Sequence, residues 1–597
     1  MAVKLERESL IDVAMGYESA DTVIINGQIV NVHTGGIQTD GIAIKDSRIA
    51  ALGDIEYTVG PKTKVIDAGG QFLVPGLVDP HTHQWHTYTN STVFAACRLL
   101  HGTTAFADGF YGHAIVNGIK AVRFFLDEVL LTPVKPIFLV PTLCYSQNRC
   151  LGFPPSPNVP TIEDLFEALN WPETKGLEEV GYDLILQRER RDRGLLRLLE
   201  ECLRQGKVPT GHGAWMHDER GLNGWIASGP LNNHEVVLLE EAIRQTQLGL
   251  QIVVREGSAC NDARQLLPMV TQRGHASRTC VLCTDVLTPD ALIGGNLADS
   301  VRTAIKNGLD PIKAIQMTTI QPAEFFRVNH DMGIIAPGRY ADILLVEHLV
   351  DFQISKVIAN GEVWVEDGKL TRQLKQPEYP KWLYGTMNIS RVLKAEDFRV
   401  PAPAGAGPTV NARVITTRDG TMEALEAHET LPVVNGEIQA DPSQGINKIA
   451  MIDRIFGTGE IGVAFIKGFN IREGCIGMTA NVFNENIVLV GASDEDMAVA
   501  ANETVKMDGG FTAVRQGKLV ATLPTPLNGL VADLPFDEMV KAQDNLMKAW
   551  REMGCTLIAP QTNLEFVTMC TMPLLKISTK GLVLLDGDRY ELLSIVV

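Results

Sequence analysis

The middle of the chain, from about residue 76 to 334, alternates short apolar runs with stretches of helical periodicity. Apolar runs of this length between turn signals are typical of buried strands, and the stretches 195–205 and 235–247 are typical of helices. Eight runs qualify as strands: 72–79, 103–108, 136–143, 176–181, 208–212, 232–236, 250–256 and 280–285. Eight strand–helix units over about 250 residues predict an α/β fold, a TIM-type (β/α)8 barrel.

An open, doubly wound sheet is the alternative interpretation of the same alternation. Such a sheet usually carries a Gly-x-Gly-x-x-Gly motif after its first strand, because a dinucleotide phosphate binds there. No such motif follows the run 72–79. The barrel is therefore favoured.

Short strands broken by turns flank this middle on both sides. Asn26-Gly27 ends a strand-like run before the barrel, and Asn360-Gly361 ends another after it. Asn-Gly between apolar runs is a strong hairpin signal. Because the two flanks share this turn chemistry, we expect them to form one small β domain, made of residues 1–75 and 335–376.

Beyond the second flank, the segment 377–409 is rich in proline and is typical of a linker. Strand-like runs at 462–466 and 487–491 and a helical stretch at 536–553 follow it. The remaining predicted domains are the barrel at 76–334 and a C-terminal α/β domain at 410–597. The role of the last domain is open between a cap or oligomer contact and a direct part in closing the pocket.

Composition narrows the class of partner. A chain of 597 residues, 45% hydrophobic and 21% charged, is typical of a globular protein of two or three domains. Its net charge of −18, with no long basic cluster, argues against nucleic acid polymers and anionic membranes as partners. The start lacks a signal-peptide core, no run is long enough to span a bilayer, and ten scattered cysteines fit reduced thiols. We expect a cytoplasmic homo-oligomer, a dimer, that acts on a small molecule.

Two histidines, His81 and His83, stand at the end of the first predicted strand. In an extended backbone, side chains at i and i+2 point the same way, so both imidazoles can reach one point. Neutral imidazoles are good ligands for divalent transition metals. A bare His-x-His also occurs in ordinary surface loops, so a metal site here depends on what ends the other strands.

Polar, metal-competent residues end six of the eight predicted strands. Because the carboxyl ends of barrel strands hold the active site, such residues there are typical of catalysis. They are His81 and His83, Glu178 and Glu179, His212, His234 and Glu235, Arg255 and Glu256, and Asp285.

This set suffices for two metal ions that share a carboxylate. The expected ligands are His81, His83 and Asp285 for one ion, His212 and His234 for the other, and Glu179 as the bridge. Only one of Glu178 and Glu179 can be the bridging carboxylate, because neighbouring residues of a strand point to opposite faces. Two ions about 3.5–4 Å apart lower the pKa of a shared water and hold the hydroxide for attack.

Two carboxylates are candidate catalysts. Asp285 has a second oxygen that can receive the proton of the attacking hydroxide, and Glu235 can donate a proton to a ring nitrogen. The alternative for Glu235 is to orient its neighbour, the ligand His234. Arg255 and Glu256 have two alternative roles: they contact the substrate, or they form a buried ion pair.

The His-x-His after strand one and the terminal Asp resemble the amidohydrolase superfamily, and several segments resemble its bacterial adenine deaminases. These segments are Thr210-Gly211-His212-Gly213, Asn233-His234-Glu235, and the stretches 254–259, 314–324, 333–338, 448–450, 457–459, 464–469 and 494–497. The resemblance runs from about residue 20 to the C-terminus. It implies hydrolytic removal of the C6 amino group of adenine, giving hypoxanthine and ammonia. It also implies manganese or iron rather than zinc, and a bridging glutamate, which supports Glu179.

The chain departs from the family pattern in three places. Val286 stands where the family commonly has a second Asp after Asp285. Asn296 lies in a changed Gly-His-Ile-Asp-His-like stretch, and Val-Phe-Asn-Glu-Asn at 482–486 replaces His-Asp-Ser-His-Asn. All six expected ligands survive these changes. A related aminopurine is therefore the alternative substrate.

Two further functions compete with deamination of a purine. A cyclic amidohydrolase would direct the same hydroxide at a ring amide, but dihydropyrimidinase-like members bridge with a lysine, whereas this chain offers Glu178 and Glu179. A non-catalytic scaffold with a relic barrel would be expected to have lost ligands.

Overall fold

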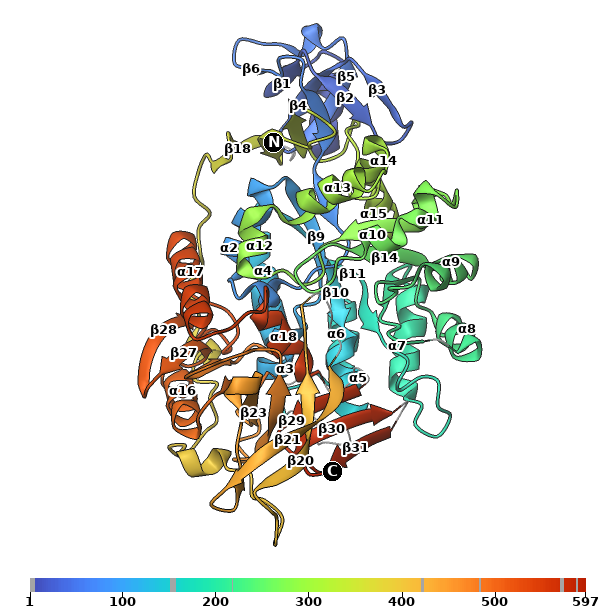
Figure 1. The fold of residues 1–597 in the computed structure, drawn as a ribbon. Coiled ribbons are helices and arrows are strands. Elements are labelled where there is room, and N and C mark those ends of the chain that lie inside the picture. Colours follow the sequence, from blue (N-terminus) through green and yellow to red (C-terminus); the bar gives the residue numbers. More distant parts are fainter. Residues whose placement is uncertain are drawn as a thin grey trace.

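The computed structural model describes residues 6–150, 157–216, 218–419, 424–482, 485–569, 574–586 and 589–597. Three regions follow one another along the long axis of the molecule (Figure 1). A small β region lies at one end, the strand–helix repeats lie in the middle, and the C-terminal sheet lies at the other end.

Eight parallel strands form the middle region, in the order in which they occur along the chain. They are β8 (Leu77–Asp79), β9 (Thr103–Asp108), β10 (Lys135–Pro141), β11 (Thr174–Val180), β12 (Val208–Gly211), β13 (Asn232–Asn233), β14 (Gln251–Arg255) and β15 (Cys280–Cys283). Strands β8 to β12 pair side by side in one sheet, and β13 to β15 in a second.

Backbone hydrogen bonds join these two sheets at both seams. Between β15 and β8, the Asp285 amide donates to the His81 carbonyl at 3.0 Å, and the His83 amide donates to the Asp285 carbonyl at 3.3 Å. Between β12 and β13, the Leu231 amide donates to the Pro209 carbonyl at 3.1 Å. The parallel strands therefore close on one another, and the predicted (β/α)8 fold is confirmed.

Amphipathic helices cover the outside of the barrel. They include α2 (Ser91–Leu100), α4 (Ile119–Leu130), α6 (Ile162–Leu169), α7 (Arg193–Arg204), α9 (Leu239–Gln247) and α13 (Asn296–Lys306). Helix α7 shows why: it buries Leu195, Leu198, Leu199 and Cys202, which share one face at helical spacing. Each fully buried leucine contributes about 1.5–3 kcal/mol.

The predicted strand 72–79 is wrong in one respect, because it is two strands. Strand β7 (Phe72–Pro75) pairs in the flanking sheet, and β8 begins the barrel. Gly76 separates them, and its amide donates to the Asp342 carbonyl at 2.9 Å. A Cβ at Gly76 would lie 2.2 Å from Oγ1 of Thr104, so only glycine allows this close passage.

The predicted helix 235–247 is also too long, because α9 begins at Leu239. The Glu235 amide instead donates to Oδ1 of Asn233 at 3.1 Å. This side-chain turn competes with helix formation and leaves a loop at the barrel mouth.

A seven-stranded sheet combines strands from before and after the barrel. In order across the sheet they are β19 (Lys369–Leu370), β18 (Glu362–Glu366), β17 (Ile354–Ala359), β16 (Ile343–Val346), β7, β2 (Gln28–Asn31) and β3 (Gly36–Gln38). A four-stranded sheet completes this region with β5 (Arg48–Gly53), β4 (Gly41–Lys45), β1 (Thr22–Ile25) and β6 (Lys64–Asp67). Asn26 and Asn360 have φ of +57° and +52°, the left-handed conformation that asparagine tolerates in a turn.

A nine-stranded sheet dominates the C-terminal region. Its strands in order are β22 (Glu437–Ile438), β21 (Leu425–Val434), β20 (Thr409–Thr416), β24 (Ile461–Lys467), β23 (Ile446–Ile452), β26 (Ile487–Gly491), β25 (Cys475–Met478), β27 (Gly510–Arg515) and β28 (Lys518–Pro524). The helices α16 (Asp494–Lys506), α17 (Phe536–Glu552) and α18 (Pro560–Val567) accompany it. Helix α18 is the red helix that lies between this sheet and the barrel in Figure 1.

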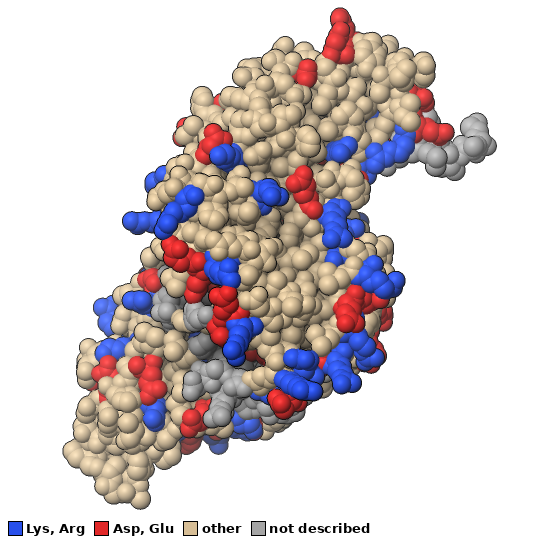
Figure 2. Space-filling view, turned by 90° about the vertical axis from the view of Figure 1, so that its right-hand side faces the viewer, with Lys and Arg blue, Asp and Glu red and all other residues tan. Residues whose placement is uncertain are grey.

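The surface carries both signs of charge. Lys and Arg side chains are interspersed with Asp and Glu side chains on the face drawn in Figure 2. In the described part of the chain, eight cysteines are free and buried, which agrees with the expectation of reduced thiols. None of the helices that the structure describes has the length and apolar character needed to cross a membrane.

Candidate functional site

His81 and His83 extend from the end of β8 into the barrel mouth. Oδ1 of Asp79, the last residue of β8, accepts the His81 amide at 3.3 Å. Each of the two imidazoles places its Nε2 3.4 Å from Oδ1 of Asp285. The structure therefore brings His81, His83 and Asp285 together as one group of possible metal ligands.

Glu179 lies among all four histidines of the expected site. Its Oε1 is 3.2 Å from Nε2 of His234 and 3.3 Å from Nδ1 of His212. The same oxygen is 3.8 Å from Nε2 of His81 and 3.9 Å from Nε2 of His83. One carboxylate thus reaches both histidine pairs, which is the geometry that a bridging ligand needs.

The backbone is strained at both Glu179 and Asp285. Their φ angles are +49° and +54°, in the left-handed region that residues other than glycine rarely adopt. Such strain costs of the order of 1–3 kcal/mol per residue and concentrates at functional sites. The Thr210 hydroxyl accepts the Glu179 amide at 3.0 Å and supports this conformation. The chain thus leaves the strand direction at the two residues that present carboxylates to the histidines.

His212, His234 and Glu235 form a second group beside the first. Nδ1 of His212 lies 3.3 Å from Nε2 of His234. Oε1 of Glu235 is 3.5 Å from that Nδ1 and 3.2 Å from that Nε2. Glu235 is therefore placed where it could serve as a ligand as well as a catalyst, a possibility that the sequence interpretation did not include.

The donor set fits divalent transition metals. Two buried atoms of the cluster, Nε2 of His81 and Oε2 of Glu179, have no hydrogen-bond partner among the described residues. Burying polar atoms without a partner is costly, so such atoms point to a missing ligand. Imidazole nitrogens and carboxylate oxygens together suit manganese, iron and zinc.

Burial and mutual charge set the protonation of the cluster. Burial, with a contribution from His234, lowers the pKa of His81 to about 4. Burial acts in the same direction on His83, but the carboxylates Glu179 and Asp285 outweigh it and raise that pKa to about 10. Burial opposes ionisation of Glu179 and Asp285, yet their histidine neighbours hold both pKa values well below the usual range. The two carboxylates are therefore anionic.

Arg255 contacts both predicted catalytic carboxylates, Glu235 and Asp285, and is not part of the cavity lining that the structure describes. Its Nη1 is 3.2 Å from Oε2 of Glu235 and 3.7 Å from Oδ2 of Asp285. Its Nε donates to Oδ2 of Asp262 at 2.7 Å. Burial alone would raise the pKa of Glu235, but Arg255 and the histidines lower it to about 2. Glu235 is thus also a carboxylate at neutral pH.

The cavity lining does not include Arg255 or Glu256 among the described residues. Oε1 of Glu256 accepts the Ala263 amide at 2.7 Å, and burial raises the pKa of Glu256 to about 7. A part for either side chain in substrate binding stays a prediction.

Glu178 faces away from Glu179, on the other side of His83. Its Oε1 accepts the Gly109 amide at 2.8 Å and lies 3.7 Å from Nδ1 of His83. Asp108 belongs to the same buried group. The sequence interpretation missed Asp108, although it ends β9 and the strand-end rule applies to it.

The cluster opens into a cavity at the barrel mouth with about 340 Å³ of free space. The lining comprises His83, His86, Tyr111, Glu179, His212, His234, Glu235, Asp285, Val286, Val482, Phe566 and Met569. Because Val482, Phe566 and Met569 come from the C-terminal region, that region forms part of the cavity wall.

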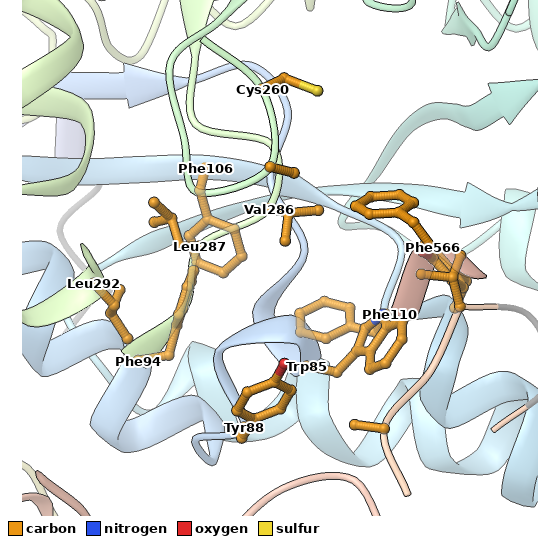
Figure 3. Packing of buried hydrophobic residues seen from close by; sticks show 14 of the residues in the cluster. Trp85, Tyr88, Phe94, Phe106, Phe110, Cys260, Val286, Leu287, Leu292 and Phe566 are labelled. Carbon is orange, nitrogen blue, oxygen red and sulfur yellow. The ribbon is translucent and has the colours of Figure 1, made fainter. Parts of the chain in front are cut away.

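Four lining residues were missed from the sequence. His86 continues the spacing His81-x-His83-x-x-His86 and could have been found by it. Tyr111 follows the end of β9 and carries a weaker signal. Phe566 and Met569 carry none, because only the docking of α18 brings them to the barrel. Phe566 packs in the same buried cluster as Trp85 and Phe110 of the barrel (Figure 3).

The departures from the expected pattern fall in different places. Val286 and Val482 line the cavity and make part of its wall apolar. Asn296 lies outside the lining, and its Oδ1 is 3.3 Å from Nη1 of Arg98. Glu485 is fully buried, and burial raises its pKa well above the usual value. Residues 483 and 484 lie outside the described residues.

Two family descriptions match the chain. Residues 72–364 match the amidohydrolase family, and residues 423–588 match the adenine deaminase C-terminal domain. The first covers the barrel and the second covers most of the C-terminal region, including α18.

Curated relatives match the chain over nearly its full length. It is 36% identical over 589 residues to an adenine deaminase of Moorella thermoacetica, with 98% of this chain and 97% of that protein covered. It is 33% identical over 597 residues to an adenine deaminase of Clostridium botulinum, with 99% and 97% covered. An adenine deaminase of Mesorhizobium japonicum is 34% identical over 587 residues, with 96% and 94% covered.

Proposed function

Because the chain belongs to the adenine deaminase family, we propose that it hydrolyses adenine to hypoxanthine and ammonia in the cavity at its barrel mouth. The observation that carries this proposal is the placement of Glu179 between two pairs of buried histidines, beside a cavity closed by the C-terminal region. A cytoplasmic, dimeric enzyme is part of the proposal.

Two divalent cations are the proposed cofactors, with manganese or iron favoured over zinc by the family resemblance. His81, His83 and Asp285 would hold one, His212 and His234 the other, and Glu179 both. When bound, such a pair supplies an activated water at neutral pH. The chemistry of the donor set supports this assignment, since every member is a buried nitrogen or carboxylate.

Two carboxylates, Asp285 and Glu235, are the proposed groups that transfer protons during the reaction. Replacing the amino group at C6 by oxygen requires both protons to leave the attacking water, one to reach N1 and the other to reach the amine that departs as ammonia. Asp285 is anionic and is the proposed base that accepts the proton of the water and returns it to the amine. Glu235 is the proposed group that serves N1.

Glu235 begins as a carboxylate, so it must gain a proton before it can give one. Arg255 holds its Oε2 and leaves Oε1 on the side of His212 and His234. The attacking water is the proposed source of that proton, which makes Glu235 a shuttle rather than a permanently protonated acid. The sequence interpretation treated it simply as a donor.

Apolar side chains form part of the cavity wall. Val286, Val482, Phe566 and Met569 are apolar and line the same space as the metal cluster. Apolar walls suit the faces of a heteroaromatic ring, and a dry site strengthens the charge interactions inside it. A related aminopurine is the second candidate substrate, because the family commonly has a second Asp where this chain has Val286.

Ammonia release from a panel of purines by the manganese-loaded protein tests the proposal. Adenine should be the best substrate and hypoxanthine its product, identified by chromatography. Turnover of another aminopurine in preference to adenine would favour the second candidate. Hydrolysis of a cyclic amide such as dihydrouracil, with no ammonia from any purine, would overturn both.

A further inference from the structure

Three buried side chains connect the C-terminal region to the cavity. Glu565 of α18 is fully buried, and its Oε2 lies 3.1 Å from Nδ1 of His86. Nε2 of His86 lies 3.1 Å from the Tyr111 hydroxyl. His86 and Tyr111 both line the cavity, whereas Glu565 does not. We call this series the Glu565–His86–Tyr111 relay.

Glu565, the residue of the relay farthest from the cavity, has a hydrogen-bond partner in the barrel region. The Tyr88 hydroxyl donates to Oε1 of Glu565 at 2.8 Å, and this bond joins residues 477 positions apart in the sequence. The Ala532 amide donates to the Tyr88 carbonyl at 2.8 Å, so the C-terminal region holds the same loop twice. Oε2 of Glu565 and Nδ1 of His86 lie close to each other without forming a hydrogen bond among the described residues, so the contact is one of charge and packing. Such a contact restricts the orientation of the imidazole and, through it, the group that its Nε2 contacts. Glu565 therefore positions Tyr111 without reaching the cavity itself.

The relay and Glu235 contact different histidines of the metal cluster. Glu235 contacts the His212–His234 pair at 3.2–3.5 Å. Tyr111 instead packs against His83, with 5.0 Å between ring centroids, and His86 lies 5.4 Å from the same ring. A ligand centred on the cluster thus meets Glu235 on one side and the Tyr111 hydroxyl on the other.

We propose that Tyr111, positioned by His86 and Glu565, is the residue that recognises the N7 edge of the purine. The inference rests on the proposed function. In adenine, C6 has N1 on one side and C5, which carries N7, on the other. With C6 at the metal cluster and N1 towards Glu235, the N7 edge faces Tyr111. N7 only accepts hydrogen bonds, so the Tyr111 hydroxyl would donate its one proton to N7 and accept from an N–H at Nε2 of His86.

The test compares adenine with 7-deazaadenine, which replaces N7 by a C–H group. The wild type should prefer adenine in kcat/KM by about 10-fold or more, because the analogue has no lone pair at position 7 to accept a hydrogen bond from the Tyr111 hydroxyl. In Tyr111→Phe, the ratio of the two kcat/KM values should fall to within about 3-fold of the ratio that the intrinsic reactivities of the two substrates would give. Glu565→Gln should reduce the preference partly, since the hydroxyl remains but is less well held.

A binding measurement separates recognition from chemistry. The dissociation constants of purine and 7-deazapurine, which have no amino group to lose, should differ for the wild type and converge for Tyr111→Phe. Metal content should stay at the wild-type level in every variant. Tyr379→Phe is the matched control: it also removes a hydroxyl that donates to a buried glutamate, Glu128, but it lies outside the cavity lining, and it should keep the preference for adenine.

The outcomes distinguish this inference from the proposed function. If the wild type deaminates adenine and Tyr111→Phe keeps the full preference over 7-deazaadenine, Tyr111 does not recognise N7. If Tyr111→Phe slows both substrates equally, the residue is structural and the inference also fails. If the wild type releases no ammonia from adenine, the proposed function fails first, whatever the relay does.

Discussion

The guanidinium of Arg255 lies 3.2 Å from the carboxylate of Glu235, on the side away from the cavity. The two residues sit at the ends of neighbouring barrel strands, and neither is more than a few per cent exposed at its charged end. This pairing keeps Glu235 ionised in spite of its burial and fixes which of its oxygens faces the histidines.

Replacing Arg255 by methionine should therefore change the pH profile of the enzyme. Without Arg255 the pKa of Glu235 rises from about 2, because burial is no longer outweighed. A proton shuttle that starts as a carboxylate works above this pKa and fails as the pH falls through it. An acidic limb should therefore appear at higher pH than in the wild type, with kcat/KM at neutral pH reduced by about 10²-fold or more.

Arg273→Met is the control for that experiment, since Arg273 is 56% exposed and pairs with Glu240 on the surface. It should leave the profile unchanged. An Arg255→Met profile that overlays the wild type would show that Glu235 does not depend on this pairing.

Glu179→Gln should remove at least one of two bound metal ions per chain. A neutral amide is a poor bridge between two cations, and Oε1 of Glu179 lies within 3.9 Å of a nitrogen of each of the four histidines. Elemental analysis of protein reconstituted with Mn²⁺ measures the loss. Glu189→Gln, at an exposed position, is the matched control. Unchanged metal content would mean that another residue bridges.

Asp285→Asn and Glu235→Gln should each slow adenine turnover by roughly 10²–10⁴-fold, as expected for a positioned acid or base. Metal content separates their roles. Asp285→Asn should lose metal, because both His81 and His83 converge on Oδ1 of Asp285. Glu235→Gln should keep both ions if it is a shuttle, whereas loss of an ion would make it a ligand of the His212–His234 group.

Asp79→Asn should destabilise the fold as well as the site. Asp79 is fully buried, pairs with Arg98, accepts the Thr284 hydroxyl at 2.6 Å and accepts the amides of His81 and Thr284 at 3.3 Å. Breaking a buried ion pair costs about 3–5 kcal/mol. Urea denaturation should show that loss, while Asp127→Asn, which breaks an exposed pair with Arg123, should cost under about 1 kcal/mol. Equal stability of the two variants would contradict the role given to Asp79.

Much of the barrel could be predicted because its strands are buried on both faces. A strand such as β15 reads as a continuous apolar run, and its end marks the active-site edge. The same rule placed His81, His212 and Asp285 near one another. It paired Arg255 with its sequence neighbour Glu256, however, because a strand pattern does not show which residues of adjacent strands meet.

The rest of the cavity wall could not be predicted. Phe566 and Glu565 lie on a helix whose sequence gives no sign of a partner, and the contact of Glu565 with Tyr88 depends on how two distant regions dock. Local patterns carry no information on such contacts. The split between β7 and β8 was missed for a similar reason, since the separate pairing of Phe72–Pro75 depends on a strand that comes much later in the chain.

The position of α18 divides the site between two separable parts of the chain. Every expected metal ligand lies at or before Asp285, whereas Phe566 and Met569 of the cavity wall follow much later in the sequence. A fragment without α18 would therefore keep all the expected ligands and lose part of the apolar wall that a purine would contact.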